Sequence, residues 1–243
     1  MNYMPTSNES RKLPVYIVAP DKNHFFPRPK LGIGFVPNGA CTNACVFCKP
    51  NVGAIQEIYA DTPIITPGKF SVQDYLTRVD SLLKKVGGVE SPDEIVITGV
   101  IGEPLLYYKN LLDLIRGLKK ISTLPIRLNT NGQAALITRK SAETVAQELR
   151  EAGLDTLAIS LDAINEKDYN IVCQPKLKGA FQSVLDLIKA GMGKINIVLT
   201  FVDYAGHKPE WPVLDKDAIC RYIEEKFHLS KENIIFRPYM TQQ

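Results

Sequence analysis

The sequence predicts an α/β fold in which six parallel strands curl into an incomplete, TIM-like (β/α)6 barrel with helices outside. Six short apolar segments rich in β-branched residues recur along the chain, and each except the last is followed by a helical segment. Parallel neighbours need a crossover connection, and helices in the crossovers cover the sheet. A complete barrel has eight strands, so six leave one side open. The 243 residues suit one such domain.

The beginning of the chain differs from the rest. Residues 1–12 are polar, so we expect a tail there, followed by a lead-in strand at 13–18 and a proline-marked loop. We therefore assign residues 1–30 to an N-terminal segment and residues 31–243 to the barrel domain. The apolar run Leu31–Pro37 predicts the first barrel strand and leads directly into a cysteine-rich loop.

The first helix is predicted from its boundaries as well as its periodicity. Ser71 is followed three residues later by Asp74, as in a capping box, and apolar residues keep helical spacing as far as Val86. Gly87 and Gly88 then end the helix. The alternation continues to the end of the chain, with strands at 94–98, 126–130, 156–161, 195–202 and 234–238 and helices at 108–121, 141–152, 179–190 and 215–227.

Bulk composition limits the possible partners. The hydrophobic fraction of 45% and charged fraction of 23% are ordinary for a globular protein with a sizeable core. A net charge of +3 does not indicate nucleic-acid binding. The N-terminal residues lack the apolar core of a signal peptide, and no apolar run approaches the roughly 20 residues that span a bilayer. We expect a cytoplasmic protein that does not enter a membrane.

Three of the five cysteines lie together, as Cys41, Cys45 and Cys48 in the run C-T-N-A-C-V-F-C. In a reducing compartment, clustered thiols are more often metal ligands than disulfide partners. A zinc site or a set of buried thiols is one interpretation. An iron-sulfur cube is the other, and three thiolates would leave one of its four irons without a protein ligand, open to substrate chemistry.

The spacing CxxxCxxC, with Phe47 before the last cysteine, resembles the cluster loop of radical S-adenosylmethionine (SAM) enzymes. Further motifs strengthen the likeness, at Gly102–Leu106, Arg127–Gln133, Ala158–Ala163, Tyr169–Pro175 and Phe236–Tyr239. With these motifs the chain resembles the TatD-family-associated radical SAM proteins from about residue 31 to residue 239. The substrate of that subgroup does not follow from the resemblance.

The resemblance implies the cofactors and the positions of their ligands. It implies a 4Fe-4S cluster bound through Cys41, Cys45 and Cys48, with SAM chelated to the open iron. Residues that follow barrel strands are then candidate SAM contacts, since the active site of such folds lies at the carboxyl ends of the strands. These candidates are Gly102 and Glu103 for the methionine amino group, Asn131, Ser160 and Asp162 for ribose and carboxylate, and Phe47 near the adenine. Simpler interpretations of the same residues are turns and helix caps.

Two cysteines and two arginines remain. Cys220 falls beside the apolar face of the last predicted helix, where a free cysteine is inert packing. Cys173 falls in the connection after the fourth strand, either as a packing residue or as a catalytic thiol that contacts substrate or supplies a hydrogen atom. Arg127 and Arg237 lie within predicted strands, where each could form a structural ion pair or bind a carboxylate or phosphate.

The sequence therefore favours a radical SAM enzyme that acts on an unidentified small molecule or protein and receives electrons from a donor such as flavodoxin or ferredoxin. Another enzymatic interpretation is an activase that installs a glycyl radical on a partner protein. Non-catalytic interpretations are an iron-sulfur or zinc module and a redox sensor, neither of which requires Glu103 or Asn131.

Overall fold

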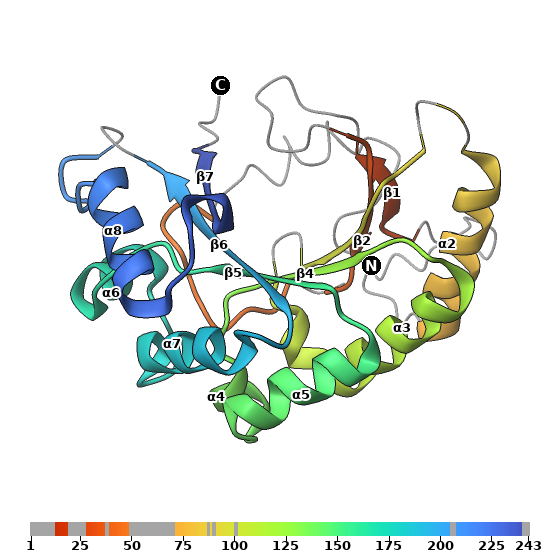
Figure 1. The fold of residues 1–243 in the computed structure, drawn as a ribbon, viewed down its shortest axis with the longest axis horizontal. Helices are drawn as coiled ribbons and strands as arrows, with labels where there is room; N and C mark the ends of the chain where they lie inside the picture. The colour runs from red at the N-terminus through yellow and green to blue at the C-terminus, as the bar shows by residue number, and fades with distance from the viewer. Residues whose placement is uncertain are drawn as a thin grey trace, which may run out of the picture.

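A computed structural model describes residues 13–18, 28–36, 39–48, 71–86, 88, 91–99, 102–204 and 208–239. Within these ranges one seven-stranded sheet has its strands in sequence order. Figure 1 shows the sheet curled into an open half-barrel with the helices on its convex side. The first strand, β1 (Val15–Val18), pairs antiparallel with β2 (Lys30–Gly34), and every later pair is parallel. The predicted incomplete barrel of six parallel strands is confirmed, and the lead-in strand extends its edge.

The predicted elements are present with boundaries shifted by a few residues at most. The other strands are β3 (Ile95–Thr98), β4 (Ile126–Thr130), β5 (Thr156–Ser160), β6 (Asn196–Asp203) and β7 (Ile234–Pro238). The helices are α2 (Val72–Lys85), α3 (Tyr108–Ile121), α4 (Ala134–Thr138), α5 (Ala142–Ala152), α6 (Glu166–Cys173), α7 (Ala180–Gly191) and α8 (Lys216–Phe227), with 3-10 helices η2 (Pro104–Tyr107) and η3 (Lys231–Asn233). The expected tail at 1–12 and the boundary residues Pro37 and Gly87 lie outside the described residues.

Helix starts follow side-chain capping. Ser71 caps α2, and its backbone N–H in turn donates to the Asp74 carboxylate at 2.7 Å, completing the predicted capping box. Ser141 and Asp215 cap α5 and α8 by accepting from the backbone N–H groups of Thr144 and Ala218. The sequence missed α4 and α6, because helices of five and eight residues are too short to display a clear apolar period. Asn165 caps α6 by accepting from the Asp168 backbone N–H.

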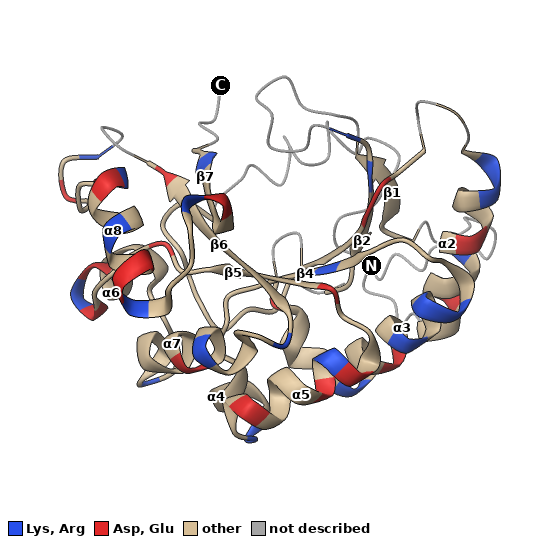
Figure 2. Ribbon diagram, in the orientation of Figure 1, with Lys and Arg blue, Asp and Glu red and all other residues tan. Residues whose placement is uncertain are grey.

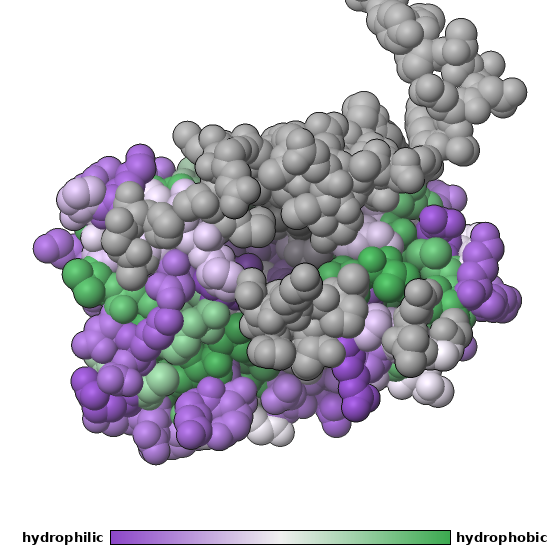
Figure 3. Space-filling view, turned by 90° about the horizontal axis from the view of Figure 1, so that it is seen from above, coloured by the Kyte–Doolittle hydropathy of each residue, from purple (hydrophilic) through white to green (hydrophobic). Residues whose placement is uncertain are grey.

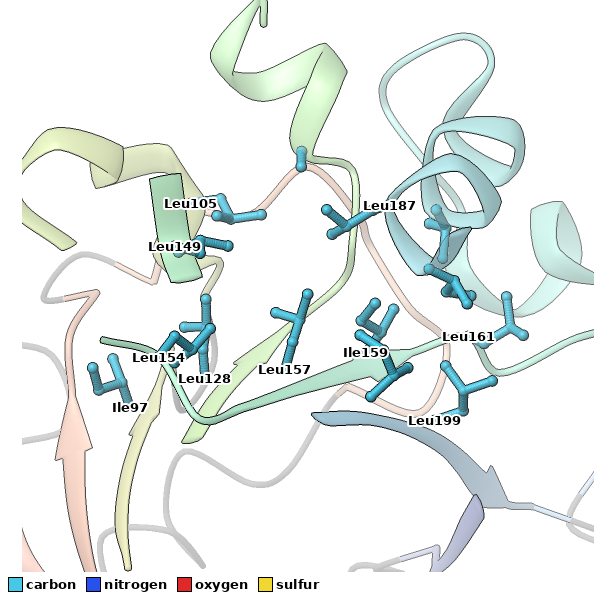
Figure 4. Close-up of a cluster of buried hydrophobic side chains, with 14 of the residues drawn as sticks. Ile97, Leu105, Leu128, Leu149, Leu154, Leu157, Ile159, Leu161, Leu187 and Leu199 are labelled. Atoms are coloured by element: carbon cyan, nitrogen blue, oxygen red, sulfur yellow. The ribbon is translucent and has the colours of Figure 1, made fainter. Parts of the chain in front are cut away.

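The core fills the space between the convex face of the sheet and the helices. Alternate strand residues such as Leu128, Leu157 and Leu199 point toward Leu149 of α5 and Leu187 of α7 (Figure 4). All five side chains are fully buried. Because successive strand residues face opposite sides, the intervening residues line the concave face.

Charged residues are distributed unevenly between the helices and the strands. In Figure 2 most charged residues lie on the helices, and the strands carry few. Near the amino ends of the strands, Lys30 bonds to Asp93 at 2.7 Å, and Arg127 lies 4.0 Å from Glu94. Arg127 thus has a carboxylate beside it, as the first of its two predicted roles, a structural ion pair, requires. Among the helices of the described ranges, none combines the length and apolar character needed to cross a bilayer.

Candidate functional site at the carboxyl ends of the strands

The cysteine loop follows β2 and reaches across the carboxyl ends of the strands. Cys41 and Cys45 are half-buried and Cys48 is exposed, all three as free thiols. The Phe47 ring stacks on Tyr204, just beyond β6, with centroids 6.2 Å apart and planes 7° from parallel. The loop therefore extends from the end of β2 to the end of β6, at the carboxyl ends of the strands.

The thiols of this loop oppose one another's ionisation. Although Cys48 reaches the surface, the protein around its sulfur displaces water, and this desolvation, followed by the nearby Cys45 and Cys41 thiols, raises the pKa of Cys48 to about 11, against the opposing positive charge of Arg237. Burial also raises the pKa of Cys41, although an N–H of Asn43 at 3.4 Å and the Asn131 amide at 3.7 Å point to its sulfur and favour the thiolate. A bound cation would remove this repulsion, so the donor set suits a thiolate-ligated metal centre.

The cysteine loop offers three thiols to a metal centre. Within the described ranges, no three His, Cys, Asp or Glu side chains are grouped closely enough to hold one metal ion. In an iron-sulfur cube each cysteine binds a different iron, so its thiolates need not converge on a single ion. The chemistry of three thiols on one loop is therefore compatible with such a cluster.

The end of α6 holds the cysteine loop in place through backbone hydrogen bonds. The Val46 N–H donates to Val172 at 2.9 Å, the Ala44 N–H donates to Cys173 at 3.2 Å, and the Lys176 N–H donates to Thr42 at 2.8 Å. The Lys176 ammonium adds a bond to the Cys41 carbonyl at 3.0 Å. The loop is therefore shaped by the protein itself.

A buried polar network supports the same loop, and the sequence did not reveal it. The Gln133 amide donates to the Asn43 side chain and, at 3.2 Å, to the Tyr169 hydroxyl. Asn43 also donates to that hydroxyl, at 3.5 Å. Asn43, Gln133 and Tyr169 are at most 6% exposed. Gln133 and Tyr169 stood in motifs identified from sequence, but their mutual contact depends on tertiary structure.

Replacing Tyr169 with Phe should loosen the cysteine loop. The change leaves the ring on Phe181 and removes the hydroxyl that accepts from Asn43 and Gln133. We expect a loss of about 1–3 kcal/mol in unfolding free energy, because two buried donors lose a partner. Amide hydrogen exchange at Ala44 and Val46 should accelerate. Tyr222→Phe is the control, since its hydroxyl accepts only from exposed Lys226; equal exchange in both variants would contradict a supporting role.

The turn after β3 packs directly against the cysteine loop. A Cβ on Gly102 would lie 2.5 Å from a Val36 methyl and 2.9 Å from the Ala40 carbonyl, so only glycine permits this approach. The Glu103 backbone N–H donates to the same Ala40 carbonyl at 2.8 Å. The sequence predicted both residues as site residues, and the structure places both against the loop.

The Glu103 carboxylate is buried, with 1% of the residue exposed. It accepts hydrogen bonds from the Leu105 N–H at 2.9 Å, the Thr130 hydroxyl at 2.7 Å and the Asn131 N–H at 2.7 Å. Burial raises its pKa to about 6, and these bonds oppose the rise. Glu103 thereby ties the turn after β3 to the turn after β4.

Asn131 connects the turn after β4 to the cysteine loop. Its side-chain N–H group donates to the Thr42 hydroxyl at 2.8 Å, and its side-chain oxygen accepts from the Gln133 N–H at 3.1 Å. The next residue, Gly132, has φ +79°, and a Cβ there would also approach Ile159 at 2.8 Å. The predicted Asn-Gly turn is present, and it places Asn131 beside Cys41.

Ser160 is the last residue of β5, and Asp162 lies two residues farther along the chain. The Ser160 hydroxyl lies 3.2 Å from the Thr200 hydroxyl of β6, and Ser160 is half-buried. Asp162 has φ +56°, and its buried carboxylate accepts from the Val202 N–H at 2.9 Å. Burial raises the pKa of Asp162 to about 6, and the positive charge of Arg237 opposes the rise.

Cys173 is the last residue of α6 and belongs to the core, with 1% exposed. We expected Cys173 in the connection after the fourth barrel strand, and it lies there, at the end of a helix that the sequence did not predict. Burial raises its pKa well above 9, and its thiol interacts with that of Cys45. Cys220 is half-buried on α8 and packs beside the core.

Residues 35–206 match the Radical SAM superfamily. The match covers most of the chain and includes the cysteine loop, the Glu103 turn and the ends of β4 to β6. The chain belongs to the radical SAM superfamily. A 4Fe-4S cluster and SAM are the cofactors of this family, and therefore of this chain.

Curated relatives have a more specific name. GTP 3′,8-cyclase of Limosilactobacillus fermentum is 30% identical over 166 residues, covering 65% of this chain and 42% of that protein. GTP 3′,8-cyclase of Petrotoga mobilis is 28% identical, covering 76% of this chain and 52% of that protein. The chain thus spans about half the length of these curated relatives.

Solved structures share the fold. The crystal structure of Streptococcus suis SuiB has a TM-score of 0.55 at 15% identity, covering 86% of this chain and 39% of that one. The crystal structure of methylornithine synthase (PylB) has a TM-score of 0.54 at 16% identity, covering 91% of this chain and 57% of that one. At these identities the likeness establishes the half-barrel alone.

The reactivity of the two remaining thiols tests the predicted catalytic role of Cys173. In the cluster-loaded enzyme under anaerobic conditions, a bulky maleimide should label Cys220 faster than Cys173, because Cys173 is 1% exposed and its pKa is raised. Unfolding in guanidinium should make the two rates similar. Faster labelling of Cys173, at a rate that SAM alters, would contradict its burial and favour a thiol that faces the substrate.

Proposed function

We propose that this chain is a radical SAM enzyme whose cluster, held by Cys41, Cys45 and Cys48, reductively cleaves SAM to a 5′-deoxyadenosyl radical that abstracts hydrogen from a substrate. The supporting observation is that the loops after β2, β3 and β4 meet at one point. Glu103 bonds to Ala40, and Asn131 bonds to Thr42 beside Cys41. A purely metal-binding module or a redox sensor requires no such convergence.

Three thiolates are one fewer than the irons of the cube, so one iron stays open to the amino and carboxylate groups of SAM. The protein's contribution is to fix this geometry before SAM arrives, because the loop is already bonded to α6 and to Asn131. The N–H groups of Asn43 and Asn131 near the Cys41 sulfur then stabilise its thiolate.

The proposed SAM contacts divide along the edge of the sheet. Gly102 and Glu103 lie beside the cysteine loop, where backbone groups and a carboxylate suit the methionine ammonium. At pH 7 Glu103 is ionised, since its pKa of about 6 lies below that pH. Ser160 and Asp162, two strands farther along, suit the ribose hydroxyls. The Phe47 ring, stacked on Tyr204, offers a flat apolar surface near the adenine.

Anaerobic turnover of SAM tests this proposal. Reconstituted protein should contain close to four irons and convert SAM to 5′-deoxyadenosine when dithionite is added. A protein lacking the thiols of Cys41, Cys45 and Cys48 should form none. Protein that binds a single zinc and never accepts a cluster would refute the proposal.

A nucleotide substrate is a second candidate, favoured by the relatives named GTP 3′,8-cyclase. The chain spans about half of their length, so the shared part accounts for the radical chemistry and leaves the substrate open. Anaerobic incubation with GTP, SAM and dithionite should consume GTP if the activity is shared. Formation of 5′-deoxyadenosine at the same rate with unchanged GTP would exclude it.

The subgroup and the partners are narrower proposals. The motifs quoted above favour the TatD-family-associated radical SAM proteins, and the alternative activity is installation of a glycyl radical on a partner protein. A flavodoxin or ferredoxin is the proposed electron donor, and the cytoplasm the proposed location. Incubation of active enzyme with anaerobic cell extract distinguishes the two activities. A metabolite whose mass changes supports the first, and a glycyl-radical signal in electron paramagnetic resonance supports the second.

A further inference from the structure

Arg237 is a charged residue on the concave face that the assignments above leave without a role. It lies in β7, opposite Val202 of β6. Its neighbour Phe236 contacts Phe201 of the core, with ring centroids 5.7 Å apart. Because strand residues alternate between faces, Arg237 points to the concave side. It is half-buried and stands at the carboxyl end of the last strand, the end at which the cysteine loop lies.

Among the described residues, the guanidinium of Arg237 forms no hydrogen bond or ion pair, and its charge acts through space on the Asp162 carboxylate and the Cys48 thiol. Its Nε is buried without a hydrogen-bond acceptor. The ion pairs formed within the described ranges do not include it. A buried guanidinium that keeps its charge normally has a carboxylate or another acceptor beside it. Within the described ranges, no acceptor is therefore assigned to this planar fork of N–H donors at the mouth of the half-barrel.

The other concave arginine shows the difference. The Nε of Arg127 is also buried without an acceptor, but Arg127 lies near the amino ends of the strands, where Glu94 at 4.0 Å balances its charge. Arg237 acts electrostatically on the Asp162 carboxylate, which already accepts from the Val202 N–H and forms no ion pair with Arg237. The Asp162 carboxylate bonds to the backbone of Val202, and Arg237 lies opposite Val202 in the next strand. The two charged groups therefore border the same part of the concave face.

We propose that Arg237 binds an oxyanion, a carboxylate or phosphate, of a small molecule held at the concave face. This inference rests on the proposed function and specifies its substrate class. Planar, paired oxygens suit the guanidinium fork. Two sources fit the chemistry: an anionic substrate, or the carboxylate of SAM. The substrate is favoured, because β7 is separated from β3, where Glu103 is proposed to meet the methionine end of SAM, by β4, β5 and β6. Neighbouring strands lie about 4.8 Å apart.

Binding measurements on unreduced, cluster-loaded enzyme test the inference, with inorganic pyrophosphate as the substrate-type probe. Calorimetry gives the affinity for SAM, and then the affinity for pyrophosphate with SAM saturating. Arg237→Gln should weaken pyrophosphate binding tenfold or more and leave SAM affinity unchanged. Arg237→Lys should give an intermediate loss, because it keeps the charge without the fork. Arg221→Gln removes the same charge from an exposed position on α8 and should match the wild type.

Each outcome decides the proposal. Weaker SAM binding in Arg237→Gln, with pyrophosphate unaffected, upholds an oxyanion contact and assigns it to the SAM carboxylate. The proposal is overturned if Arg237→Gln leaves the affinities for both ligands unchanged. It is also overturned if the wild type binds no pyrophosphate and the variant binds SAM normally. In either case Arg237 is left as a counter-charge for Asp162. If Arg237→Gln does not fold, Arg237→Lys provides the same comparison. Iron content and reductive SAM cleavage by the wild type are measured separately, so failure of the proposed function is recognised independently.

Discussion

Replacing Cys41, Cys45 or Cys48 with Ala should each remove most of the iron from anaerobically reconstituted protein. The cube is held by three thiolates, so the loss of one leaves two irons without a protein ligand. Iron and sulfide content, with the brown absorbance of the cluster, measure the effect directly. This loss of iron should be the largest effect of any single substitution, because the thiolates bind the cluster directly. The hydrogen bonds from α6 and Asn131 shape the loop and provide no metal ligand.

Cys220→Ala is the matched control for these variants. Its thiol is half-buried on α8, away from the loop, and its removal should leave the iron content unchanged. Cys173→Ala is a second and stricter control, because that thiol interacts with Cys45 without belonging to the CxxxCxxC spacing. Full iron retention in a Cys41, Cys45 or Cys48 variant would remove that residue from the ligand set.

Replacing Glu103 with Ala should have the second largest effect, on stability as well as on SAM. Three donors, from Leu105, Thr130 and Asn131, lose their acceptor in a site that excludes solvent. We expect the unfolding free energy to fall by about 3 kcal/mol or more, since each unsatisfied buried donor costs about 1–3 kcal/mol. SAM affinity should fall by tenfold or more, because a charge-assisted contact contributes about 1.5–3 kcal/mol.

Glu103→Gln separates the two effects, because it keeps an acceptor and removes the charge. The pKa of Glu103 is about 6 in the folded chain and 4.5 ordinarily, so the folded state holds more protons than the unfolded state between these values. The contribution of Glu103 to stability is present below pH 4.5 and is lost as pH rises through 6, by about 2 kcal/mol. Urea unfolding of the cluster-free protein should show this loss reduced in Glu103→Gln. An unchanged pH dependence, with SAM affinity equal to wild type, would relegate Glu103 to a neutral hydrogen-bonding residue.

The half-barrel was predictable because each strand and its helix carry local signals. The capping pair Ser71 and Asp74 and the apolar period of α3 are contained in short stretches of chain, and the structure reproduces both. The short helix α6 lacks such a local signal, and the sequence did not predict it. Its eight residues contain too little periodicity to distinguish a helix from a loop.

Contacts within the site depend on pairs far apart in sequence. The motif around Glu103 was visible, but its hydrogen bonds to Thr130 and Asn131 join residues 27 and 28 positions away. The sequence treated Arg127 and Arg237 alike, since both stand in strands. Strand register and neighbouring charge distinguish them: the Nε of each is buried without an acceptor, but among the described residues only Arg127 has an ion-pair partner, Glu94. Composition and periodicity contain neither kind of information.

The described surface on the side seen in Figure 3 carries apolar residues in separate patches and polar residues along most of its outline. In Figure 2 the charged residues lie mainly on the helices.

The bonds between the cysteine loop and the end of α6 constrain the order of events on the ribosome. Lys176 contacts Cys41 across 135 residues, so the thiols leave the ribosome long before the segment that shapes their loop. At roughly 5–20 residues per second, the interval is about 7–27 s. During that time the nascent thiols are reactive but not preorganised. Delivery of iron and sulfide to a stable site must therefore wait until translation has passed α6, and a stall before that point would leave a chain open to oxidation.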